Sequence, residues 1–128
     1  KLNSLQTVLL TYIMRERERE RERERKQASY VKKDKNFLLH LIFGLIVIVC
    51  GFIFHITKVE WLFILLAIGL VLAFETINTA IEYVVDLVTT DYHILAKKAK
   101  DVAAFSVIIA SIIAVLIGLI VFLPYIFK

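Results

Sequence analysis

The membrane character of the chain is clearest in residues 61–86, WLFILLAIGLVLAFETINTAIEYVVD, where an apolar run passes without a turn into polar sequence. A helix rises about 1.5 Å per residue, so about 20 apolar residues cross the roughly 30 Å hydrocarbon core of a bilayer. Counted from Trp61, Glu75 lies roughly 21 Å along such a helix. Ionisable side chains at this depth are rare and commonly functional. The stretch therefore predicts a membrane helix that carries a site.

Two other segments are long enough to span a membrane, residues 37–56 and about 102–127, while the central span continues to about residue 88. Hydrophobic residues make up 59% of the chain, against about 45–50% in an average soluble domain. The first two spans are joined only by TKVE, which predicts a tight antiparallel hairpin. In the second connection, TTDYHILAKKAK, Asp91 is the expected N-cap of the third helix. The sequence thus predicts an all-α membrane protein with three transmembrane helices.

The N-terminal part of the chain differs in character from the spans. Residues 1–14 carry apolar side chains at helical spacing but are too short to cross a membrane, so they could lie on its surface or fray. Residues 15–26, RERERERERERK, form a low-complexity run typical of a solvated charged segment. We therefore divide the chain into an N-terminal amphipathic and Arg/Glu segment, residues 1–29, and a transmembrane domain, residues 30–128.

Lysine placement predicts the orientation. Three lysines precede the first span within residues 32–35, and three precede the third span within residues 97–100, whereas the opposite side has only Lys58 and Lys128. Basic residues are retained on the cytoplasmic side of a membrane. We expect a multi-pass protein of the plasma membrane with a cytoplasmic N-terminus.

The polar residues of the second span share one helical face. At 100° per residue, Glu75, Asn78, Glu82 and Asp86 fall within about 80° of one another. Further polar residues are expected at the same membrane surface: Asp34, Lys100 and Asp101. On the third helix, Ala104 and Ser111 continue the face of Asp101 and would let a neighbouring helix approach. The simpler interpretation is that the Asn78 amide only forms hydrogen bonds between helices, and that the charged residues only mark the point where the second helix reaches water.

This set of side chains suits phosphoryl transfer. Carboxylate and amide oxygens are the ligands that Mg²⁺ prefers, commonly together with substrate phosphates. A carboxylate deeper in apolar surroundings can act as a general base, and Lys100 could neutralise phosphate charge. Such transfer needs mainly positioning and charge compensation. Neither GxxxxGK[ST] nor GxGxxG occurs in the sequence, so a nucleotide would have to be bound in another way.

Three motifs, ETINTAIEYVVDLVT, DYH and AKKAKDVAA, resemble the bacterial integral-membrane diacylglycerol kinase family, in the form found in Gram-positive undecaprenol kinases. The resemblance covers about residues 30–124. It implies a homotrimeric helical bundle with three membrane helices and an N-terminal surface helix in each subunit. It also implies phosphorylation of a lipid alcohol, undecaprenol or diacylglycerol, by ATP with Mg²⁺, at sites shared between subunits. No nucleic acid partner is expected.

The same resemblance implies roles for individual residues. Glu75 matches the catalytic base, Glu82 a metal-binding glutamate, and Asn78 an asparagine of the site. In KKDKNFLLH, Asp34 stands in the place of a second metal-binding glutamate. The nucleotide-side polar groups are matched by Asp86, Lys100 and Asp101. MRERERERERERKQ stands where the family has a surface helix that helps to cover the nucleotide.

Two alternatives to an active lipid kinase remain open at this point. One is an inactive or degenerate kinase homologue, because the N-terminal segment departs from the family. The other is a small ion-coupled transport subunit with Glu75 as a proton site. Residues 61–74 offer no further polar groups along the path, which counts against transport.

Overall fold

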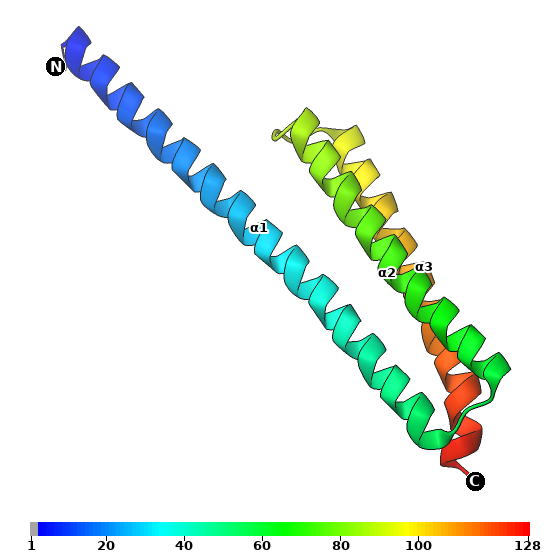
Figure 1. Cartoon of the computed structure of the whole chain (residues 1–128). Helices are drawn as coiled ribbons and strands as arrows, with labels where there is room; N and C mark the ends of the chain where they lie inside the picture. Colours follow the sequence, from blue (N-terminus) through cyan, green and yellow to red (C-terminus); the bar gives the residue numbers. More distant parts are fainter. Residues whose placement is uncertain (1–2) are drawn as a thin grey trace. The chain divides into compact units, whose positions relative to one another are not determined.

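The computed structural model describes residues 3–128, and all regular secondary structure within that range is α-helical. Its helices are α1 (Ser4–Phe54), α2 (Lys58–Val88) and α3 (Ile94–Ile126) (Figure 1). Each contains a segment long and apolar enough to cross a membrane, which confirms the predicted three-span, all-α class. The chain divides into two units, Lys1–Lys35 and Asn36–Lys128, which are described separately below. The predicted division at residues 29 and 30 stays a prediction.

In the N-terminal unit, Asn3 explains where the helix begins. Its side-chain Oδ1 accepts a hydrogen bond from the Gln6 backbone N at 2.8 Å, and Gln6 Oε1 accepts one from the Asn3 backbone N at 3.2 Å. This reciprocal pair is a capping box, which satisfies two donors at a helix start. Within the Arg/Glu run, Arg19 Nη1 donates to Glu16 Oε1 at 2.9 Å, one turn away. Such exposed pairs support a helix only weakly, by about 0.2–0.5 kcal/mol each.

A second capping box fixes the turn between α1 and α2. The Glu60 backbone N donates to Thr57 Oγ1 at 3.2 Å, and Thr57 Oγ1 donates to Glu60 Oε1 at 3.0 Å. His55 turns the chain with a φ of 51°, in the left-handed region that few non-glycine residues adopt. The predicted tight hairpin is therefore present, but it is shorter than TKVE, because Lys58–Glu60 already belong to α2.

The connection between α2 and α3 corrects one sequence prediction. Asp91 is not the N-cap of the third helix; His93 is, and its Nδ1 accepts a hydrogen bond from the Leu95 backbone N at 3.1 Å. Asp91 instead lies in the loop, where its backbone N donates to Thr89 Oγ1 at 3.2 Å. This local turn occupies Asp91 two residues before the helix starts, and the imidazole supplies the capping acceptor in its place.

Close packing in the transmembrane unit depends on small residues. Helices α2 and α3 lie side by side along their length (Figure 1). Ala67, Ala103 and Ala110 are buried in the unit. Gly44 and Gly51 are the buried residues of α1. A Cβ at Gly51 would lie 2.6 Å from the Trp61 ring, so only glycine allows this approach.

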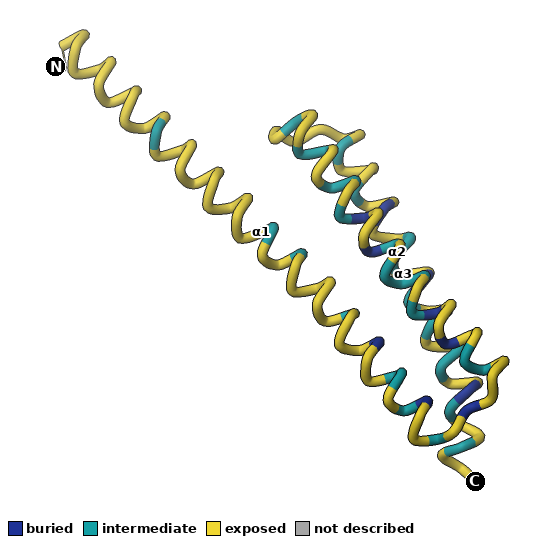
Figure 2. Tube along the Cα trace, viewed as in Figure 1, coloured by how far each residue is buried: buried dark blue, intermediate teal, exposed yellow. Residues whose placement is uncertain are grey.

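Most large apolar residues are exposed, and exposed residues, drawn in yellow, predominate along the trace in Figure 2. In water this would be untenable, but in a bilayer the hydrocarbon chains cover these side chains. A membrane helix bundle accordingly holds together through close packing and polar contacts between helices, without a large apolar core. The small buried cluster of Ile56, Ile64 and Val121 lies at the α1–α2 turn.

Candidate functional site

The buried polar side chains of the described residues lie on one face of α2. Glu75 and Asn78 have exposed fractions of only 7% and 9%, although both lie in a membrane span. Glu82 and Asp86 are half-buried farther along the same helix, whereas Thr76 and Ile77, between Glu75 and Asn78, are exposed. The helical period thus turns the four predicted side chains of α2 toward the interior of the unit.

Glu75 has a neighbour that the sequence analysis did not foresee. Its Oε2 lies 3.8 Å from Nε2 of His40 on α1, and the side chains of Glu75 and His40 are 10% and 32% exposed. The sequence alone suggests only an interfacial histidine at position 40. The contact could have been inferred from the alignment of α1 with α2 in the hairpin, in which Gly51 lies against Trp61 and Gly44 against Ile68. Continuing that antiparallel register along both helices brings His40 level with Leu72, one helical turn from Glu75, so the two side chains can reach each other.

Asn78 and Glu82 form the next layer of the site. Asn78 Nδ2 donates to Glu82 Oε1 at 3.4 Å, one turn farther along α2. Asn78 Oδ1 is buried and accepts no hydrogen bond from any of residues 3–128. Leaving such an acceptor buried costs about 1–3 kcal/mol. The Asn78 amide therefore uses its nitrogen end within this chain and leaves its oxygen end without a partner among these residues.

These oxygens fit a magnesium ion by their chemistry. Mg²⁺ takes oxygen ligands, usually one or two carboxylates together with water and substrate phosphates. The Asn78 amide oxygen and the Glu82 carboxylate are such ligands on one helix face. Within residues 3–128, no three His, Cys, Asp or Glu side chains are grouped as a metal site. Asp34 is exposed and belongs to the N-terminal unit, and its pairing with Glu82 stays a prediction.

An ion pair joins α2 to α3 near their connection. Lys100 Nζ donates to Asp86 Oδ1 at 2.6 Å, and the two side chains are 40% and 23% exposed. The structure thereby brings together two of the three residues expected on the nucleotide side. The third, Asp101, is exposed. This contact is a charge-assisted hydrogen bond, and both side chains keep some access to water.

The face of α3 that meets α2 differs from the predicted one by a single residue. Ala103 and Ala110 are buried, whereas Ala104 is exposed and Ser111 is only half-buried. One residue corresponds to a rotation of 100° about the helix axis. The prediction took its direction from Lys100 and Asp101, but a lysine reaches its partner from the edge of an interface through a long flexible stem.

Comparison with known proteins identifies the family. The profile described as prokaryotic diacylglycerol kinase matches residues 27–122, three quarters of the chain. The undecaprenol kinase of Bacillus subtilis is 43% identical over 93 residues, which covers 73% of this chain and 76% of that protein. No solved structure gives a significant match.

Two diacylglycerol kinases are also similar. That of Synechocystis is 42% identical over 92 residues, 71% of this chain and 53% of that protein. That of Haemophilus influenzae is 35% identical over 82 residues, 64% of this chain and 70% of that protein. The chain therefore spans about half the length of the first of these and most of the second.

Proposed function

Because the chain belongs to the prokaryotic diacylglycerol kinase family and is a membrane lipid kinase, we propose that it transfers the γ-phosphate of ATP to the hydroxyl of a lipid alcohol. The observation that supports this most strongly is the buried Glu75 carboxylate, which shares a helix face with the buried Asn78 oxygen. A water-facing helix end would not require either group to be buried. The relatives' names do not favour the transport alternative.

In the proposed reaction, Glu75 accepts the proton of the lipid hydroxyl as that oxygen attacks the γ-phosphorus; the bond from the γ-phosphorus to the β,γ-bridging oxygen breaks, and ADP leaves. General bases of this kind contribute about 10²–10⁴ in rate. His40, at 3.8 Å from Glu75, limits the orientations that the carboxylate can take. The depth of Glu75 suits an acceptor that never leaves the bilayer, because a lipid hydroxyl can reach it from the side of the membrane.

The nucleotide-facing groups lie nearer the α2–α3 connection. Lys100 would meet phosphate oxygens, and Asp86 holds its ammonium group in place through the 2.6 Å contact. Asn78 and Glu82, together with Asp34 as predicted, would hold Mg²⁺, which supplies charge compensation for the ATP phosphates when bound. Asp101 is proposed to belong to the same nucleotide side.

Several finer features belong to this proposal. The acceptor is undecaprenol or diacylglycerol, since both kinds of kinase occur among the relatives. The working form is a homotrimer with sites shared between subunits, and the N-terminus is cytoplasmic. A shared site would let a second copy of the chain add ligands to Asn78 and Glu82.

The test is a lipid phosphorylation assay on the purified chain in mixed micelles. Undecaprenol and diacylglycerol are offered separately and in competition with labelled ATP and Mg²⁺. Label should appear in at least one extracted lipid, and the competition should identify the preferred acceptor. No labelled lipid from a folded, membrane-inserted preparation would leave the degenerate homologue as the better account.

A further inference from the structure

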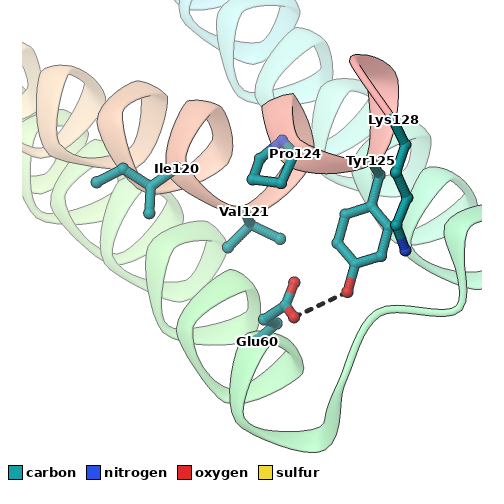
Figure 3. A pocket seen from close by; sticks show the side chains of 6 residues that line it. All are labelled: Glu60, Ile120, Val121, Pro124, Tyr125 and Lys128. Atoms are coloured by element: carbon teal, nitrogen blue, oxygen red, sulfur yellow. Dashed lines mark hydrogen bonds between the residues drawn. The ribbon is translucent and has the colours of Figure 1, made fainter.

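A second polar site lies at the opposite end of the α2–α3 pair from Asp86 and Lys100. It is a hollow of about 280 Å³, called the Glu60 pocket here (Figure 3). Its lining residues come from the start of α2 and the end of α3: Glu60, Ile120, Val121, Pro124, Tyr125 and Lys128. Because α2 begins at Lys58 and α3 ends at Ile126, we expect the pocket to lie where the spans reach the headgroup region.

One oxygen of the Glu60 carboxylate accepts two hydrogen bonds, whereas the other accepts none from the described residues. Oε1 accepts hydrogen bonds from Thr57 Oγ1 at 3.0 Å and from the Tyr125 hydroxyl at 2.8 Å (Figure 3). Oε2 is buried and accepts none from residues 3–128. A buried carboxylate oxygen is a strong acceptor, and leaving it without a donor is costly. Oε1 alone makes the capping contact with Thr57 and the contact with Tyr125 of α3. The unpartnered Oε2 therefore indicates a ligand that donates hydrogen bonds.

The negative charge of Glu60 and the positive charge of Lys128 favour a zwitterionic ligand over a metal cation. Lys128 lines it, and Lys128 Nζ lies 5.7 Å from the centroid of the Tyr125 ring. A bare metal cation would meet a single carboxylate beside a lysine ammonium group, which is a poor metal site. A zwitterion that carries both an ammonium and a phosphate group would find a partner for each charge.

We propose that the Glu60 pocket binds the headgroup of a phospholipid with a primary ammonium group. The Glu60 carboxylate turns so that Oε2, which is buried in this structure, accepts a hydrogen bond from the ammonium group. The phosphate group meets Lys128, and the apolar wall of Ile120, Val121 and Pro124 accommodates the glycerol and upper acyl chains. A quaternary ammonium group fits less well because it has no hydrogen to donate. This site is separate from the kinase site and does not depend on its activity.

The test is native mass spectrometry of residues 1–128 in detergent, titrated with phosphatidylethanolamine, phosphatidylcholine and phosphatidylglycerol of identical acyl chains. We expect phosphatidylethanolamine to bind about tenfold more tightly than phosphatidylcholine, the size of one charge-assisted hydrogen bond. Glu60→Gln should abolish this preference. Its amide oxygen can still accept from Thr57 and Tyr125, so the fold is kept, but its nitrogen cannot accept from an ammonium group. Asp91→Asn removes an exposed carboxylate elsewhere and should leave the preference unchanged.

A second variant covers the case in which Glu60→Gln fails to fold. Lys128→Met changes an exposed side chain beyond the end of α3 and should weaken phosphatidylethanolamine binding several-fold by removing the phosphate partner. The proposal is wrong if phosphatidylcholine or phosphatidylglycerol binds as tightly as phosphatidylethanolamine, or if folded Glu60→Gln keeps the preference. Binding of soluble glycerophosphoethanolamine without binding of the lipid would equally overturn it.

Discussion

The glycines of the spans allow a test of the packing that positions His40 against Glu75. A Cβ at Gly51 would lie 2.6 and 2.8 Å from two atoms of the Trp61 ring, which cannot yield without moving the whole indole. A Cβ at Gly44 would lie 3.1 Å from Ile68 Cγ2, a contact that a small shift relieves. Around Gly69 and Gly118 nothing lies within 4 Å of the added atom.

The expected free energies follow from two opposing terms. Replacing a helical glycine by alanine gains about 0.5–1 kcal/mol of helix stability. Overpacking costs about 1–3 kcal/mol. Gly51→Ala should therefore lose about 0–2.5 kcal/mol, and Gly44→Ala should stay close to the parent. The two alanine controls at positions 69 and 118 should gain up to about 1 kcal/mol.

The assay is reversible unfolding in mixed micelles with increasing SDS, monitored by helical circular dichroism and by Trp61 fluorescence. The order of midpoints should be Gly118→Ala at or above the parent, then Gly44→Ala, then Gly51→Ala. Displacement of the indole should also alter the emission of the folded Gly51→Ala protein. Equal midpoints for Gly51→Ala and Gly118→Ala, with unchanged emission, would refute the close approach of α1 to α2.

Three further predictions concern the candidate site. A double-mutant cycle of Asp86→Asn and Lys100→Met should give a coupling of about 0.5–1 kcal/mol in unfolding, since the pair is partly exposed, and zero coupling would contradict the ion pair. His40→Phe should lower lipid phosphorylation while SDS stability stays within about 1 kcal/mol of the parent, because a ring of similar size without nitrogen atoms no longer restrains the Glu75 carboxylate. Unchanged turnover would remove His40 from the site. Asn78→Leu should raise the Mg²⁺ concentration needed for half-maximal activity, measured by metal titration, and an unchanged titration would show that its buried oxygen is not a metal ligand.

The fold was largely predictable because lipid imposes simple rules. Apolar runs of about 20 residues must be helices, and a short connection such as TKVE must form an antiparallel hairpin. The polar face of α2 followed from the helical period alone. The two helix caps were harder to predict. Thr57 and Glu60 have the spacing of a capping box, whereas His93 caps α3 in place of Asp91, whose backbone N takes part in the preceding turn.

Contacts between helices were the part that sequence patterns did not supply. The helical period gives a direction on one helix but no relative rotation of its partner, so Ala104 was chosen where Ala103 is buried. The contact of His40 with Glu75 depends on hairpin register, and the contact of Tyr125 with Glu60 joins residues 65 positions apart. Neither can be read from spacing within one segment.

The central claim is that Glu75 takes the proton of a lipid hydroxyl during phosphoryl transfer. Its most direct test compares the parent with Glu75→Gln, an isosteric change that removes the base and keeps the volume of the buried side chain. Transfer of labelled γ-phosphate to undecaprenol and diacylglycerol should fall by about 10²–10⁴ at saturating ATP and Mg²⁺, while SDS stability and ATP affinity stay close to the parent. Lipid phosphorylation within a few-fold of the parent would contradict the assignment of Glu75 as the base.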